Sequence, residues 1–210
     1  MTSAFGNILT ASSIERSTTA LLKKWFPTYL REMERIEGWE REPLVEPRNY
    51  TTRNSFDDLV GEEMPKCVVL SPGLFRVPNH PESGGYYNAM WQLGVGVACA
   101  APSEELADQM VKMYGAAARA ILLQHQDLER EQGDVIGVHW LDENYEDLPI
   151  EDQLMLYKAA AVYTGVEAEK VTSRYMRPPV VDESAQILDQ IEEVILEIPD
   201  YDLTVTTPAP

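Results

Sequence analysis

The most informative stretch of the sequence lies at residues 86–125 and reads YYNAMWQLGVGVACAAPSEELADQMVKMYGAAARAILLQH. From residue 87 to residue 99, large apolar side chains alternate with small or amide-bearing ones, among them Gln92, Gly94 and Gly96. A period of two places the two sets on opposite faces of a β-strand. We expect the apolar face to hold the core. The glycine-bearing face allows a close approach, which we expect to come from a packed helix, with a subunit contact as the alternative.

The second half of this stretch predicts an amphipathic helix from about residue 103 to His125. Ser103 is a good N-cap, and the acids Glu104 and Glu105 suit the positive end of a helix. Apolar residues recur along one stripe, and the alanines at 116–118 keep the helix slim enough to lie close to a sheet. Residues 128–132 then suggest a short helical extension.

A second helix is predicted near the N-terminus. Apolar residues recur at spacings of three and four over residues 21–36. Ser13 or Ser17–Thr18 could cap its start, and Gly38 is expected to end it. Because Pro27 lies inside the pattern, we expect a kink or two helices that meet there.

The remaining segments read mainly as strands and loops. Residues 50–52 favour a strand, and residues 67–70 predict a short strand that stops at the turn signal Ser71–Pro72–Gly73. We expect loops at 74–85 and 142–147, a helical turn or loop at 56–60, and strands at 135–141 and 155–171.

This order predicts an α+β fold, a mostly antiparallel sheet with helices packed on one face. We assign residues 1–177 to one domain, with residues 1–38 as its N-terminal helical segment. Residues 178–210 form an acidic C-terminal arm, whose pattern fits both helix and strand.

Charge is spread unevenly along the chain. The formal net charge is −18, of which residues 127–151 and residues 178–210 each contribute −8. Without clustered Lys and Arg, the chain is not expected to grip the phosphate backbone of nucleic acid. The acidity either serves solubility alone or forms a surface that must not adhere to DNA. The sequence contains no stretch of about 18 apolar residues, so no membrane-spanning helix is predicted. The N-terminus lacks the pattern of a secretory signal.

No motif for phosphate or dinucleotide binding occurs in the sequence. Cys67 and Cys99 have no CxxC partner and are expected to be reduced, buried thiols. His80, His125 and His139 are isolated from one another, so we expect structural roles and neither a metal nor a cofactor.

The segment 142–147 holds the only plausible carboxylate cluster: Asp142, Glu143, Glu146 and Asp147. Paired carboxylates can carry out acid–base hydrolysis when their environments separate their pKa values. The alternative is a solvated acidic loop. With no other catalytic pattern in the chain, we expect a protein that is not an enzyme, with a hydrolase as the remote alternative.

Four strings of the sequence resemble, in order, segments of a known family. They lie at residues 66–73, 87–97, 114–125 and 140–149. The family is that of the tail terminator proteins of long non-contractile-tailed (siphovirus-type) bacteriophages, those of actinobacteria in particular. With its flanking segments the likeness covers about residues 15–177, whereas the arm after Pro178 matches poorly.

The resemblance implies a structural virion protein that forms a ring of about six copies. Such a ring caps the tail tube, stops its polymerisation and joins it to the head-side connector. Its partners would be further copies of itself, the major tail tube protein and the connector. DNA would pass through an acidic lumen without specific binding. The location would be the virion tail or neck, and the host cytoplasm during assembly.

The resemblance carries no catalytic residue. The candidate subunit-contact or lumen residues are Gln92, Gly94, Gly96, Asp142, Glu143, Glu146 and Asp147. Another neck component, such as a head-closure or connector protein, or a tail tube subunit shares the composition and stays an alternative.

Overall fold

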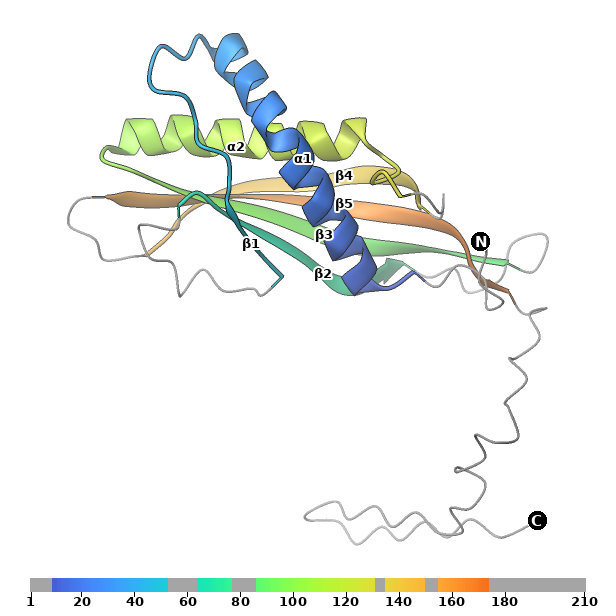
Figure 1. Cartoon of the computed structure of the whole chain (residues 1–210). Coiled ribbons are helices and arrows are strands. Elements are labelled where there is room, and N and C mark those ends of the chain that lie inside the picture. Colours follow the sequence, from blue (N-terminus) through green and yellow to red (C-terminus); the bar gives the residue numbers. More distant parts are fainter. Residues whose placement is uncertain (1–8, 53–63, 77–85, 131–134, 150–154, 174–210) are drawn as a thin grey trace, which may run out of the picture. The chain divides into compact units, whose positions relative to one another are not determined.

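Two helices cover one face of a five-stranded sheet in the residues that the computed structural model describes, which are 9–52, 64–76, 86–130, 135–149 and 155–173 (Figure 1). The elements are α1 (Ala11–Glu37), β1 (Asn49–Thr51), β2 (Lys66–Arg76), β3 (Tyr86–Ala101), α2 (Glu104–Gln124), β4 (Val135–Asp147) and β5 (Leu156–Ser173). The strand order is β1-β2-β3-β5-β4. Among the described strands, β1 and β2 pair in parallel, and the pairs β2–β3, β3–β5 and β5–β4 are antiparallel. The predicted α+β class is confirmed.

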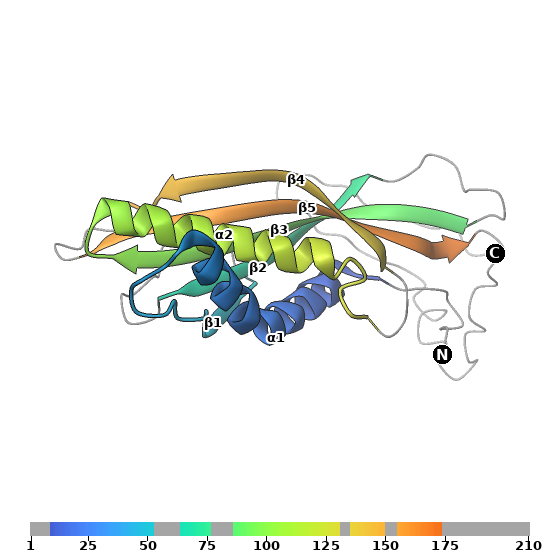
Figure 2. The same cartoon turned by 90° about the horizontal axis from the view of Figure 1, so that it is seen from above.

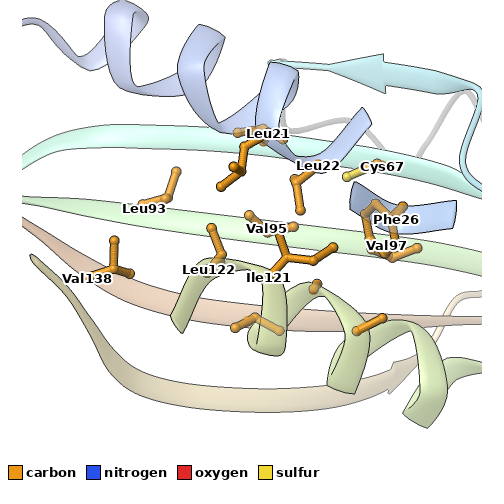
Figure 3. Close-up of a cluster of buried hydrophobic side chains, with 14 of the residues drawn as sticks. Leu21, Leu22, Phe26, Cys67, Leu93, Val95, Val97, Ile121, Leu122 and Val138 are labelled. Atoms are coloured by element: carbon orange, nitrogen blue, oxygen red, sulfur yellow. The ribbon is translucent and has the colours of Figure 1, made fainter. Parts of the chain in front are cut away.

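Strand β3 lies between β2 and β5 and supplies the centre of the core. Its side chains Leu93, Val95 and Val97 point toward the helices (Figure 3). They meet apolar side chains of both helices, namely Leu21, Leu22 and Phe26 from α1 and Ile121 and Leu122 from α2. The predicted alternation along residues 87–99 is confirmed.

The expectation that a helix covers Gly94 and Gly96 is wrong. Both helices pack on the opposite face of β3, where the large apolar side chains offer more surface to bury. On its own face, Gly94 pairs with Tyr163 of β5. A Cβ at Gly94 would lie 3.5 Å from the ring of Tyr163. The close neighbour of this glycine is therefore an aromatic side chain of the same sheet.

Helix α1 is longer than predicted, because it begins under the cap Thr10. The side chain of Thr10 accepts a hydrogen bond from the Ser13 backbone N–H, and the Ser13 hydroxyl accepts one from the Thr10 N–H. Ser13 is therefore the third residue of the helix and not its cap. Pro27 lies within this single helix, whose ribbon changes direction near its middle (Figure 2). Gly38 ends the helix at φ 62°, as predicted.

Strand β2 does not stop at Ser71–Pro72–Gly73. The turn residues are absorbed as an irregularity in the pairing with β3, between Leu70 and Gly73. The Ser71 hydroxyl donates to the Gln92 carbonyl at 2.7 Å, and the Ser71 N–H donates to Glu15 of α1 at 2.8 Å. Gly73 takes φ 132°, a conformation that favours glycine. Residues 74–76 are therefore strand, and residues 77–85 lie outside the described residues.

The predicted acidic loop at 142–147 is also wrong, because these residues form the second half of β4. Each position from Asp142 to Asp147 pairs with β5, from Tyr163 back to Lys158. β4 is the outermost strand on its side of the sheet, and charged side chains are well tolerated on such an edge.

The other predicted elements are largely confirmed. Ser103 caps α2 and His125 follows its last residue, while β1 and β5 occupy the predicted strands near 50 and 155–171. The helical extension after His125 is wrong. Leu128 and Glu129 take φ 54° and 49° in a turn, which buries Leu128 in the core. The helical turn or loop at 56–60 and the arm 178–210 lie outside the described residues.

Candidate interaction surfaces

Gln92, Gly94 and Gly96 lie in the middle of the sheet face opposite to α1 and α2, which we call the far face. They line a shallow groove of about 180 Å³ together with Leu70, Ala161 and Tyr163 among others. Two of the residues that β3 contributes there are glycines, which leave the surface hollow. The structure therefore keeps these three predicted residues together on one surface.

The four candidate acids do not share that arrangement. Asp142 and Glu146 pair with Tyr163 and Ala159, which lie on the far face. Glu143 pairs with Val162, so Glu143 and Asp147 lie on the helix side of the sheet. Alternation along β4 thus divides the four carboxylates between two faces. The arrangement gives no convergent pair for acid–base chemistry. Within the described residues, no group of His, Cys, Asp and Glu could hold a metal ion.

Glu143 is not solvated, contrary to expectation. Its side chain is 6% exposed and forms an ion pair with Arg119 of α2. The Tyr145 hydroxyl also donates to Glu143, and the Arg119 guanidinium lies 5.0 Å from the centre of the Trp140 ring. Partial burial, and then the Glu143 carboxylate, raise the pKa of Tyr145 to about 12. This network fixes the β4 edge to α2. The one sequence signal for this network was Arg119, a charged residue within the alanine run 116–120.

Asp147 has a structural partner as well. Lys158 of β5 lies 2.7 Å from Asp147 and 2.6 Å from Asp108 of α2. Hydrogen bonds to these two carboxylates raise the pKa of Lys158, and the same contact lowers that of Asp108. Of the four acids, Asp142 and Glu146 are the ones that the far face presents.

Exposed apolar side chains gather on the outer strands. Nine large hydrophobic residues are exposed in the described part of the chain, and six of them lie on β2 or β4. They are Leu74 and Phe75 on β2, and Ile136, Trp140, Leu141 and Tyr145 on β4. Such clustering at the rims of a sheet is typical of surfaces that meet another protein. The sequence had not singled out this set, because the signal requires the strand order.

The two rims also differ in charge. β4 holds four acidic residues and neither Lys nor Arg, whereas β2 holds Lys66 and Arg76 and no acid. Arg48, which directly precedes β1, is exposed on the β2 side. The formal charges of β4 and β2 therefore differ in sign, with Glu143 and Asp147 of β4 already paired within the chain and the exposed Glu46 two residues before Arg48.

The cysteines and histidines have ordinary structural surroundings. Cys67 and Cys99 are free and buried, as predicted. Burial raises the pKa of both thiols, that of Cys99 to about 12. The His125 ring stacks on Trp25 with centroids 4.6 Å apart, and His139 lies 2.7 Å from Glu167. His80 lies outside the described residues. In the described part of the chain, no helix is long and apolar enough to cross a bilayer.

No family model matches the chain, and no curated protein sequence matches it. Among solved structures, one similar chain belongs to the virion of a native gene transfer agent particle. The TM-score is 0.38 and the identity 14%, over 68% of this chain and 90% of that chain. Similarity at this level assigns no function.

Proposed function

We propose that this chain is a structural subunit of a virion, and more specifically a tail terminator. It would form a ring that caps the tail tube, stops its growth and joins it to the head-side connector. One observation carries the proposal. The four strings that resemble tail terminators fall on the consecutive elements β2, β3, α2 and β4. β2 pairs with β3, and α2 packs against both β3 and β4, so the four segments lie together in the folded chain although β5 separates β3 from β4 in the sheet.

The far face suits the wall of a channel for DNA. It presents Asp142 and Glu146 beside the small residues around Gly94, and no helix of the described part covers it. Acidic side chains repel phosphate over about 8–10 Å at physiological salt. We propose that this face lines the lumen, that α1 and α2 lie outward, and that DNA passes without specific binding.

The proposed protein acts by assembly and has no catalytic step. Its carboxylates at 142–147 are divided between two faces, and Glu143 and Asp147 are held by Arg119 and Lys158. The partners would be further copies of the chain, the tail tube protein and the connector. It would reside in the virion and, during assembly, in the host cytoplasm.

Inactivation of the gene in the virus that encodes this chain tests the proposal. Loss of a tube cap removes the stop to polymerisation, so electron microscopy should show tails of abnormal and variable length without heads. A complementing wild-type copy is the control. Tails of normal length that lack heads would instead identify a head-closure or connector protein, and absence of tails a tube subunit. Normal particles would contradict any role in the virion.

A further inference from the structure

We infer that copies of this chain associate head to tail, with the outer edge of β4 in one copy against the β1–β2 edge of the next. The inference deepens the proposed function and rests on it for the closure of a ring. Strand direction, register, exposure and charge support the contact itself.

Strand direction permits this contact. β2 pairs antiparallel with β3, β3 with β5, and β5 with β4. β2 and β4 therefore run in opposite directions. When all copies have the same orientation, β4 of one copy meets β2 of the next as an antiparallel neighbour. Repetition of one such contact gives a ring if the rotation closes and a filament if it does not.

The registers place the matching parts of the two edges at equal heights. One row across the sheet consists of Leu74, Trp91, Val166 and Val138. Another row consists of Asn49, Lys66, Ala98, Ala159 and Glu146. Rotation about an axis parallel to the strands keeps each row at its own height. The apolar parts of the two edges then face each other, and so do the charged parts.

In the apolar part, Leu74 and Phe75 on β2 are 55% and 56% exposed. On β4, Trp140 and Leu141 are 52% and 44% exposed and lie two and three positions from Val138, the residue on the row of Leu74. Contact between the copies would remove all four from water. The ion pair of Glu143 with Arg119 holds this part of β4 against α2, so the surface is formed before association.

In the charged part, Glu146 of β4 is exposed and lies on the row of Asn49. The exposed Arg48 directly precedes Asn49. In a head-to-tail contact, Glu146 of one copy approaches Arg48 of the next. Such pairs set orientation and register more than affinity.

Side chains are expected to carry the contact more than a continuous backbone ladder. The Ser71 N–H is already bonded to Glu15, and Pro72 has no N–H to donate. β1 occupies the outer side of β2 at Lys66–Val68. These features interrupt the hydrogen-bonding edge of β2. Natural proteins use such interruptions to prevent nonspecific pairing of edge strands.

Two variants of the full chain test the inference by mass measurement in solution. Leu74→Asp places a charge in the apolar surface of the β2 edge, and Leu141→Asp does the same at the β4 edge. Each variant alone should be monomeric, whereas an equimolar mixture should form dimers and nothing larger, since one intact junction remains. Wild type and the matched control Ile36→Asp, whose side chain is 57% exposed on α1, should form larger assemblies. Phe75→Asp and Ile136→Asp serve as a second pair if a first variant fails to fold.

Several results would overturn the inference. A monomeric wild-type protein would contradict it, and so would variants that assemble as the wild type does. Dimers of Leu74→Asp alone would also contradict it, because they would require a symmetric β4–β4 contact. Rings that depend on both edges but do not limit tube growth would instead contradict the proposed function and leave the contact in place.

A charge exchange tests the register. Glu146→Arg should weaken self-association about two- to fivefold, the range of an exposed ion pair. Arg48→Glu should do the same, and the double variant should recover most of the loss. If the effects of the two substitutions on self-association are simply additive, Glu146 and Arg48 do not face each other across the contact.

Discussion

At Gly115, helix α2 lies close to β4 and β5. A Cβ there would lie 3.1 Å from the Ala160 Cβ, 3.2 Å from a Glu143 oxygen and 3.3 Å from the Tyr145 ring. Gly115→Val should lower the free energy of unfolding by about 1–3 kcal/mol, because the strand behind it cannot move away. Urea denaturation measures this. Ala116→Val introduces the same side chain at the next helical position, away from that contact. It costs helix propensity, whereas Gly115→Val gains some, so a lower stability of Gly115→Val can come only from packing. Equal stabilities of the two variants would contradict the packing.

The two thiols give a second prediction at the residue scale. Burial raises the pKa of Cys67 and Cys99, so the folded chain holds both as neutral thiols at pH 8. Since only the thiolate attacks a disulfide reagent, both should stay unreactive until the protein unfolds in urea. The absorbance of the chromophore that the reagent releases measures the extent of thiol reaction. Reaction of either thiol in the folded protein at the rate of a free cysteine would show that the core opens there.

At the scale of elements, the start of α1 depends on a short polar exchange between Thr10 and Ser13. Thr10→Ala should lower the free energy of unfolding by about 0.5–2 kcal/mol, because the Ser13 backbone N–H loses the Thr10 hydroxyl as its partner. Ser12→Ala, an exposed position in the same turn, is the control and should have little effect. Thermal or urea unfolding compares the variants. No difference between the two would mean that this end of the helix frays.

The attachment of β4 to α2 can be measured by a double-mutant cycle. Arg119→Met and Glu143→Gln should show a coupling of about 1–2 kcal/mol in unfolding experiments, since the Glu143 carboxylate is buried. The exposed pair Arg35–Glu32 is the matched comparison and should couple far more weakly. Additive effects at Arg119 and Glu143 would contradict the role of this pair as an anchor.

The elements differ in how far the sequence could predict them. β3 and α2 follow from periods of two and 3.6, which depend on neighbouring residues alone. The ends of β2 and β4 do not. Ser71–Pro72–Gly73 has the chemistry of a turn, and residues 142–147 have the composition of a loop. Pairing with β3 and β5 overrides both tendencies.

At the scale of the whole molecule, the arrangement of the candidate residues depends on strand order and register. The sequence pointed to the acids at 142–147 and to the surface around Gly94. It could not show that Asp142 and Glu146 share the far face while Glu143 turns toward Arg119. Nor could it show that the exposed apolar side chains of β2 and β4 lie on opposite sides of one sheet. Those facts require contacts between segments far apart in the chain.

The central claim is that this chain caps a tail tube. A reconstruction of the intact virion by electron cryo-microscopy tests it most directly. The proposal predicts a ring of about six copies at the junction of tube and connector, with Asp142 and Glu146 facing the DNA. Copies repeated along the tube, a ring on the portal side of the neck, or particles without the chain would contradict it.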